Sequence, residues 1–485
     1  MGFKAQFRDH ITQGYGDTIA LIDAHQKFSY RQLLDAIDER VSWLAKWRVP
    51  SGVVALSFTP NIWSVVTYLA CLEAKIPLLL LDPNTSTKLI LPQLTTLGVV
   101  CWIKSATEQE IISTQGAECH PDVALLLSTS GSTGAAKSVM LSMQNLLSNA
   151  QSISQYLPMS YGDCGISSLP LSYSYGLSLL NSHLLVGATF VLTSEPLISK
   201  VFWNLMLEHN VSSLAGVPFS YQMLKTLRFE RMALPALKTL TQAGGKLSQD
   251  LARHFYQVAK DSGRKLYLMY GQTEATARMG YLPPEYLPEY ADCIGISIPG
   301  GTFCLRDLQT RALIETDYTQ GELCYQGDNV MLGYASDAAA LKDVSQISEL
   351  TTGDIAERLP NGLYRIKGRL SRFIKVQGKR FALDEIEASL TQAEFGDCIA
   401  CGQDERLVIA HLPTMNCEAL RTHCLNVFGL HPSLFTLLEC SSYPRLNNGK
   451  LDYALLLATV NAGVNRLDLN EQASDVQSQH QAEVE

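Results

Sequence analysis

Residues 127–138 read LSTSGSTGAAKS and combine hydroxyl side chains, two glycines and a lysine. They follow an apolar stretch, residues 123–127, that predicts a buried strand. Glycines let backbone N–H groups turn toward an anion, and hydroxyls and a lysine ammonium can bind the same anion. The run therefore predicts a phosphate-binding loop whose ligand is a nucleoside triphosphate.

Two interpretations of this loop differ in the structure expected after residue 138. Counted from Gly131, the spacing approaches the P-loop pattern GxxxxGK[ST], but Ala136 stands where that pattern has glycine. A P-loop runs directly into a helix, whereas residues 139–141 continue an apolar extended segment and Ser142 is typical of the N-cap of a later helix. A P-loop-type ATPase is therefore the less favoured alternative.

The loop resembles instead the signature loop of the adenylate-forming superfamily, which has the pattern TSG[ST]TGxPKGV. This superfamily includes acyl-CoA synthetases and the adenylation enzymes that load carrier proteins. Further motifs similar to those of the family occur in its order along residues 28–452. They are residues 28–33, 72–77, 81–83, 169–176, 216–218, 243–247, 270–276, 321–323, 352–354, 368–369 and 444–450.

Composition narrows the class of protein. The formal net charge of −9, without a basic stripe, argues against a nucleic-acid partner. The most apolar region, residues 65–81, is interrupted by charges and a proline, so no membrane insertion is expected. The start lacks the apolar core of a signal peptide, and the twelve cysteines are scattered, which predicts reduced thiols and a cytoplasmic location. Cys398 and Cys401 are interpreted as a structural pair.

Short apolar stretches alternate with amphipathic stretches such as 146–156 and 247–260, which predicts a layered α/β fold. The resemblance implies more detail. It implies a large multi-sheet N-terminal domain over residues 1–368, a hinge at 369–371 and a small mobile α+β C-terminal domain over 372–463. The polar residues 464–485 predict a disordered tail.

The resemblance also implies the activity, that of an ATP-dependent carboxylate adenylating ligase that uses ATP and Mg²⁺. A carboxylic or small amino acid would become an (amino)acyl-AMP and then pass to the phosphopantetheine thiol of a carrier protein. An acyl-CoA synthetase that uses free coenzyme A is the alternative. An inactive nucleotide-binding regulator is less favoured, because Lys450, Glu274 and Lys137 are all present.

By resemblance, each motif residue receives a role. The catalytic residues would be Lys450, Glu274 and Thr273, with Glu274 also holding the metal. The nucleotide would be bound by Ser130, Gly131, Ser132, Thr133, Gly134, Lys137, Gly244, Gly245, Tyr270, Gly271, Gln272, Asp354 and Arg369. The substrate pocket would contain Tyr173, Tyr175, Gly176, Val217 and Pro218, and Lys375 and Gly378 would line a pantetheine tunnel.

Departures from the family pattern bear on substrate and hinge. Residues 173–178 lack the aspartate that amino-acid adenylation domains carry there, which favours an uncharged carboxylic acid, although backbone carbonyls can also bind an ammonium. Tyr173 and Tyr175 would crowd the pocket, which favours a very small substrate and a similarity to the glycine-activating enzymes of lipid A modification. Ser371 replaces the usual hinge aspartate, so the pivot between the domains is expected to differ.

Overall fold

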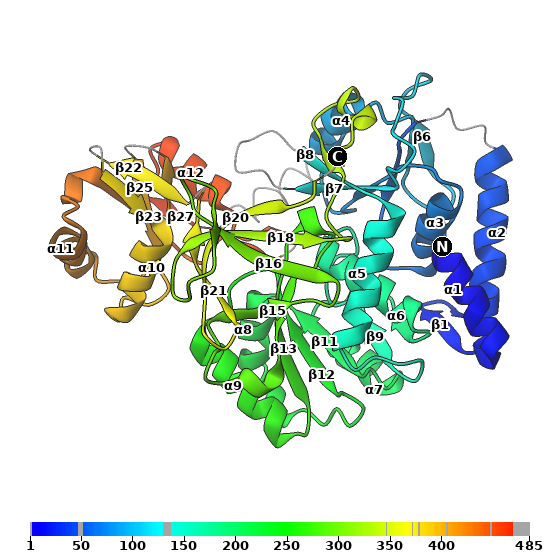
Figure 1. Ribbon diagram of the computed structural model, residues 1–485, viewed down its shortest axis with the longest axis horizontal. Coiled ribbons are helices and arrows are strands. Elements are labelled where there is room, and N and C mark those ends of the chain that lie inside the picture. The colour runs from blue at the N-terminus through cyan, green and yellow to red at the C-terminus, as the bar shows by residue number, and fades with distance from the viewer. Residues whose placement is uncertain are drawn as a thin grey trace, which may run out of the picture.

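The computed structural model describes residues 2–46, 52–129, 137–345, 347–370, 372–376, 379–403, 406–446 and 449–468 (Figure 1). One mixed sheet has the strand order β19-β8-β7-β4-β3-β5-β6. Its strands are β3 (Val54–Ser57), β4 (Leu78–Leu81), β5 (Cys101–Ile103), β6 (Gln109–Ile111), β7 (Leu125–Thr129), β8 (Lys137–Leu141) and β19 (Gly333–Ala335). The run predicted to bind phosphate thus joins two adjacent antiparallel strands of this sheet, β7 and β8.

A second, longer sheet has the order β11-β12-β13-β14-β15-β21-β20-β18-β16-β17. Its parallel part is β11 (Ser213–Gly216), β12 (Thr239–Gln242) and β13 (Lys265–Tyr270). Its antiparallel part is β14 (Gly280–Leu282), β15 (Cys293–Ser297), β16 (Gly301–Arg306), β17 (Leu313–Ile314), β18 (Gly321–Gly327), β20 (Leu350–Arg358) and β21 (Tyr364–Arg369). A smaller sheet joins β1 (Ile19–Ile22), β2 (Lys27–Ser29), β9 (Cys164–Ile166) and β10 (Thr189–Val191).

Helices cover these sheets. They are α1 (Phe3–His10), α2 (Tyr30–Lys46), α3 (Ile62–Glu73), α4 (Thr87–Thr96), α5 (Met143–Tyr156), α6 (Ser174–Leu185), α7 (Lys200–Glu208), α8 (Pro218–Thr226) and α9 (Gln249–Asp261). Helix α5 begins where the sequence predicts, because Ser142 and Asn145 form a reciprocal capping box. The apolar stretch 65–81 is core, since α3 and β4 are buried there. Among the described helices, none combines the length and apolar character needed to cross a bilayer.

Residues 373–467 form two hydrophobic clusters of their own, distinct from those that hold the preceding sheets together. Strands β22 (Phe373–Val376) and β23 (Lys379–Ala382) form a hairpin, and β24 (Ile399–Gln403), β25 (Arg406–His411), β26 (Phe435–Cys440) and β27 (Arg466–Leu467) form a sheet. Helices α10 (Leu383–Gln392), α11 (Cys417–Phe428) and α12 (Tyr453–Asn461) pack with them in a lobe at one end of the molecule (Figure 1). The predicted α/β fold, with a large multi-sheet part and a small α+β part, is confirmed.

Helix α6 positions much of the candidate site because it is buried along its whole length. A helix buried on every side must satisfy its polar side chains internally. Ser178 Oγ donates to the Tyr175 carbonyl at 2.7 Å, and Asn181 Nδ2 donates to Tyr68 Oη at 3.1 Å. The first bond satisfies a hydroxyl within α6, and the second joins α6 to Tyr68 of α3 and so helps to fix the rotation of the helix.

Candidate active site

Asp354, in the middle of β20, joins three other predicted nucleotide-binding residues at or just beyond the ends of β13 and β21. Asp354 is only 1% exposed and lies opposite Arg369 in the β20–β21 register, with Arg369 Nε 2.8 Å from its Oδ1. Tyr270 Oη donates to Asp354 Oδ2 at 2.5 Å, and Gln272 Nε2 donates to the same oxygen at 3.3 Å. Burial, together with the Asp354 charge, raises the pKa of Tyr270 well above its usual value. The four side chains are therefore held in one arrangement, with the negative charge of Asp354 balanced by Arg369.

Thr273 and Glu274 follow on a short 3₁₀ turn, Thr273–Ala275, just beyond β13. Thr273 Oγ1 lies 3.1 Å from Ser174 Oγ at the start of α6. Tyr334 Oη of β19 donates to Glu274 Oε1 at 2.8 Å. The Lys137 ammonium lies 5.6 Å from the centre of the Tyr334 ring. Tyr334 thus connects the predicted metal ligand to the lysine that ends the loop motif.

Tyr334 was not predicted from the sequence. It lies 60 residues from Glu274 in the chain and outside every motif. Its position follows from the pairing of β19 with β8, which places Tyr334 opposite Val139. Burial and the Glu274 charge raise the pKa of Tyr334, so its hydroxyl stays a donor at neutral pH.

Lys450 reaches the same region from the C-terminal lobe. Its ammonium lies 5.4 Å from the centre of the Tyr173 ring. The side chain keeps an exposed part, yet the protein atoms around its ammonium and the charge of Arg369 lower its pKa, and Glu274 opposes the shift. Arg445, on the same loop, stacks at 4.7 Å on Phe219 of α8.

Two glycines make these approaches possible. Gly449 has φ +78°, and a Cβ on it would lie 2.7 Å from Val217 Cγ2. Gly244 has φ +81°, and a Cβ on it would lie 2.6 Å from Tyr173 Oη and 3.1 Å from Val217 Cγ1. Only glycine combines this backbone conformation with this lack of space. Tyr173, Val217, Gly244 and Gly449 therefore form one close-packed group.

The remaining predicted pocket residues lie around this group. Pro218 begins α8 and would touch a Cβ on Gly245 at 3.1 Å. Tyr175 Oη donates to the Thr241 carbonyl at 3.1 Å, and its ring lies 6.3 Å from that of Tyr173. Gly176 packs against the backbone of Pro170, and Gly271 against that of Ala277.

Arg278 is a buried cation that was also not predicted from the sequence. Its side chain is 0% exposed, and its Cζ lies 4.1 Å from the centre of the Tyr175 ring. Burial raises the pKa of the neighbouring Tyr156 to about 12, and the Arg278 charge opposes that shift. An arginine in a sequence usually indicates a surface position, so only packing could show this burial.

The loop residues, the hinge serine and the two tunnel residues are the remaining sequence predictions. Ser130, Gly131, Ser132, Thr133, Gly134, Ser371 and Gly378 lie outside the described residues. Lys375 lies in β22, opposite Arg380 of β23.

One further group of side chains has metal-ligand chemistry. Cys304 and Cys324, which face each other on β16 and β18, and Glu349 place their ligand atoms within 4.8 Å of one another. Arg306 lies 2.9 Å from Glu349 and lowers its pKa to about 2. This ion pair competes with a cation for the carboxylate, so Glu274 is the better candidate for a metal ligand. All twelve cysteines, including Cys398 and Cys401, have free thiols.

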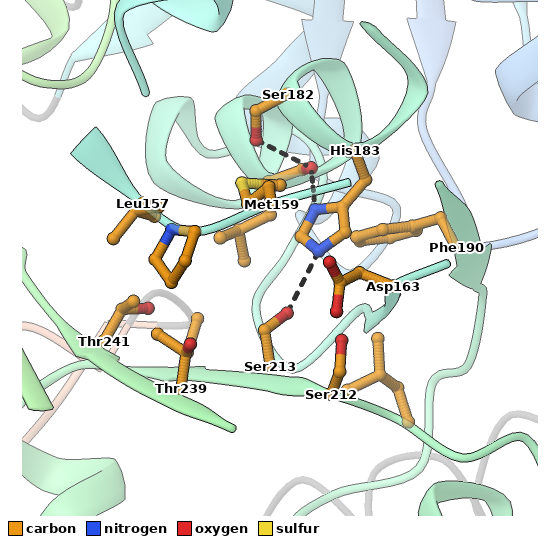
Figure 2. Close-up of a pocket in the computed structure, with 14 residues that line it drawn as sticks. Leu157, Met159, Asp163, Ser182, His183, Phe190, Ser212, Ser213, Thr239 and Thr241 are labelled. Atoms are coloured by element: carbon orange, nitrogen blue, oxygen red, sulfur yellow. Dashed lines mark hydrogen bonds between the residues drawn. The ribbon is translucent and has the colours of Figure 1, made fainter. Parts of the chain in front are cut away.

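A small cavity, partly open to solvent, lies beside α6 (Figure 2). Within it, His183 is held by the Leu179 carbonyl at 2.7 Å and by Ser213 Oγ at 3.0 Å. Burial lowers the pKa of His183 to about 4, so the ring is neutral at pH 7. Thr241 lines this cavity and also bonds Tyr175, one of the predicted substrate-pocket residues. None of the predicted site residues that the structure describes lines this cavity.

Comparison with known proteins gives a consistent result. Residues 104–335 match the family described as AMP-binding enzyme. The chain is 25% identical to enterobactin synthase component F of Escherichia coli O157:H7 over 90% of its own length, but spans only 38% of that protein. It is 28% identical to the oxalate–CoA ligase of Arabidopsis thaliana, over 58% of the chain and 55% of the ligase. The structure of O-succinylbenzoate coenzyme A synthetase from Bacillus subtilis with AMP superposes with a TM-score of 0.76, at 21% identity over 94% of this chain and 98% of that one.

Proposed function

Because the chain belongs to the adenylate-forming superfamily of AMP-binding enzymes, we propose that it activates a carboxylic or small amino acid and loads it onto a carrier protein. The carboxylate oxygen attacks the α-phosphorus of ATP, the bond from Pα to the bridging oxygen breaks, and pyrophosphate leaves. The carrier's phosphopantetheine thiolate then attacks the acyl carbonyl, and AMP leaves as the thioester forms.

One observation carries the proposal, the approach of Lys450 from the C-terminal lobe to Tyr173. Lys450 comes from the C-terminal lobe, yet its ammonium lies 5.4 Å from the Tyr173 ring and is subject to the charge of Glu274. A lysine ammonium between a carboxylate and an α-phosphate stabilises the negative charge that spreads over both in the transition state.

The other residues receive supporting roles. Asp354 would bind the ribose hydroxyls with Arg369, and the ring of Tyr270 with Gly244 and Gly245 would bound the adenine. Thr273 would contact the α-phosphate, and Lys137 with residues 130–134 would hold the β- and γ-phosphates. Glu274 would hold Mg²⁺, since its carboxylate is a hard oxygen ligand fixed by Tyr334. When bound, Mg²⁺ supplies positive charge that offsets that of the phosphates.

The acceptor has two candidates with the same thiol chemistry. Enterobactin synthase component F is named as a synthase component and the oxalate–CoA ligase as a user of coenzyme A, so relatives point both ways. The closing motif at residues 444–450 resembles that of carrier-loading enzymes and favours the carrier protein. Lys375 and Gly378 would line the tunnel for either pantetheine arm.

Exchange of radiolabelled pyrophosphate into ATP, measured across fatty, aryl, dicarboxylic and amino acids, tests the first half-reaction. Exchange that depends on one class of acid is the expected result, and ATP hydrolysis without any acid would refute adenylation. The best acid is then incubated with ATP and either coenzyme A or phosphopantetheinylated carrier protein, and thioester is followed by mass. Acyl-CoA formation without carrier loading would show that the acceptor is coenzyme A and not a carrier protein.

A further inference from the structure

Arg278 carries a positive charge into the interior without a negative partner. Within the described part of the chain no carboxylate forms an ion pair with it. Its Nη1 contacts Met269 Sδ at 2.6 Å and its Nη2 donates to Ser178 Oγ at 3.2 Å. Its Nε finds no hydrogen-bond partner among the described residues.

Such an arrangement is costly in the free protein. An arginine keeps its charge at any ordinary pH, and a buried charge is normally paired or fully hydrogen-bonded. The ring of Tyr175 at 4.1 Å offers a cation–π contact, and a thioether is a weak acceptor. Neither compensates for a missing anion. A charge retained at this cost indicates a ligand that supplies the anion.

Helix α6 sets the position of Arg278 relative to the proposed nucleotide site. Ser174 contacts Thr273, which belongs to the proposed nucleotide site. Ser178, one helical turn further along, accepts from Arg278. One turn of helix advances about 5.4 Å. Both serines line a small cavity bounded also by Asn149, Asn181 and Thr276.

Resting on the proposed function, we propose that Arg278 binds a second anionic group of the acid, so that the substrate is a short dicarboxylic acid. One carboxylate reacts near Thr273 and Lys450, and the other lies about one helical turn away, at the guanidinium. The short spacing limits the acid to a few carbons.

This assignment sharpens the expectation drawn from residues 173–178. The lack of an acidic residue there argues against binding an ammonium, and a buried guanidinium argues against it further. Neither argument disfavours a second carboxylate. An acid with a single carboxylate and no other charge, or glycine, is therefore the alternative substrate that the experiment must exclude.

The test compares acids that match in length and differ in one carboxylate. Pyrophosphate exchange is measured for malonate against propionate, succinate against butyrate, and glycine. A charge-assisted contact predicts that kcat/KM for one diacid exceeds that of its matched monoacid about tenfold or more. Arg278→Met removes this preference and Arg278→Lys restores part of it. Arg264→Met is the matched control, because Arg264 likewise stacks on an aromatic ring, Phe229, but is only partly buried, and it should leave the preference unchanged.

A second measurement does not depend on turnover. Thermal unfolding is followed with malonate, succinate and their matched monoacids, for the native chain and for Arg278→Met. The diacid should raise the melting temperature of the native chain only. Equal use of matched acids, a preference for glycine, or a diacid preference that survives Arg278→Met would overturn the assignment while leaving adenylation intact. Absence of exchange with every acid would count against the proposed function, and the melting shift would still decide whether Arg278 binds diacids.

Discussion

The two ends of the candidate site treat buried charge in opposite ways. At the nucleotide end, Asp354 is surrounded by Arg369, Tyr270 and Gln272, so its charge is balanced before any ligand arrives. At the end that we propose to bind the acid, the acyl end, Arg278 is buried against Tyr175, Met269 and Ser178, without an ion pair to any carboxylate among the described residues.

We interpret the first arrangement as one that positions side chains and the second as one that recognises a ligand. A balanced cluster holds its side chains in one geometry and adds to the stability of the fold. An unpaired buried charge lowers the stability of the fold, and a ligand of opposite sign would compensate it. The nucleotide end should therefore respond to mutation through stability and affinity together, and the acyl end through specificity.

The largest expected effect concerns Lys450, where the two ends meet. Lys450→Ala should lower the rate of adenylate formation by about 1,000-fold, because it removes the charge that stabilises the transition state. Thioester formation from supplied acyl-adenylate should stay largely intact if the domains alternate between half-reactions. Both rates are followed by rapid quench, with Lys450→Arg as the charge-retaining control. Equal loss in both half-reactions would contradict alternation.

Asp354 tests whether the nucleotide end is a structural unit. Asp354→Asn should lower the free energy of unfolding by about 2 kcal/mol, because Arg369 and Tyr270 lose their buried partner. The KM for ATP should rise in the same variant. Urea unfolding and initial rates measure the two effects. An unchanged free energy of unfolding would show that the charges at this end are not coupled.

Glu274 and Tyr334 test the metal at the boundary of the two ends. Glu274→Ala should weaken Mg²⁺-dependent turnover far more than nucleotide affinity. Tyr334→Phe removes only the 2.8 Å bond that orients the carboxylate, so it should raise the Mg²⁺ concentration for half-maximal rate by about tenfold. Magnesium titrations at saturating ATP measure both. Superimposable titrations for the native chain and Glu274→Ala would remove Glu274 from the site.

Substitution of Arg278 should change the free energy of unfolding in the opposite direction to substitution of Asp354. Arg278→Met should raise the free energy of unfolding of the ligand-free protein by about 1 kcal/mol, because it replaces an unpaired buried charge by an apolar chain of similar length. Urea unfolding beside Asp354→Asn makes the comparison direct. A destabilisation as large as that of Asp354→Asn would show that Arg278, like Asp354, stabilises the ligand-free fold.

The smallest expected effect is a shift in a pH profile. Because its surroundings and Arg369 lower the pKa of Lys450, its ammonium loses a proton at a lower pH than a free lysine does. Adenylation needs the charged form, so the rate should fall on the alkaline side earlier than in Lys450→Arg. Glu274 opposes the shift, so Glu274→Gln should move the alkaline limb to still lower pH. An alkaline limb that does not move between these variants would exclude Lys450 as its cause.

The sequence predicts local structure well wherever neighbouring residues decide it. The apolar residues before the loop predict a strand, and β7 runs from Leu125 to Thr129. Ser142 predicts a helix start, which its capping box with Asn145 provides. Caps and strand patterns involve residues a few positions apart, so they can be recognised without knowing the fold.

Family resemblance extends this to the chemistry, because the motif residues occur in a fixed order. Tyr270, Gln272, Asp354 and Arg369 were each selected from motifs, and the structure brings them into one hydrogen-bonded and ion-paired cluster. Their roles toward the nucleotide stay predictions. The loop residues 130–134 and Gly378 lie outside the described residues, so the same comparison does not reach them.

The amino-acid sequence alone was enough to predict the α/β class, the starts of individual helices and strands, and the set of motif residues that point to adenylation. Three-dimensional packing was needed to show that Tyr334 orients Glu274, that Lys450 contacts Tyr173, and that Arg278 is wholly buried. These three facts depend on contacts between residues far apart in the chain or on complete removal from water. Both arise from the packing of whole elements, and no local pattern of residue types encodes them.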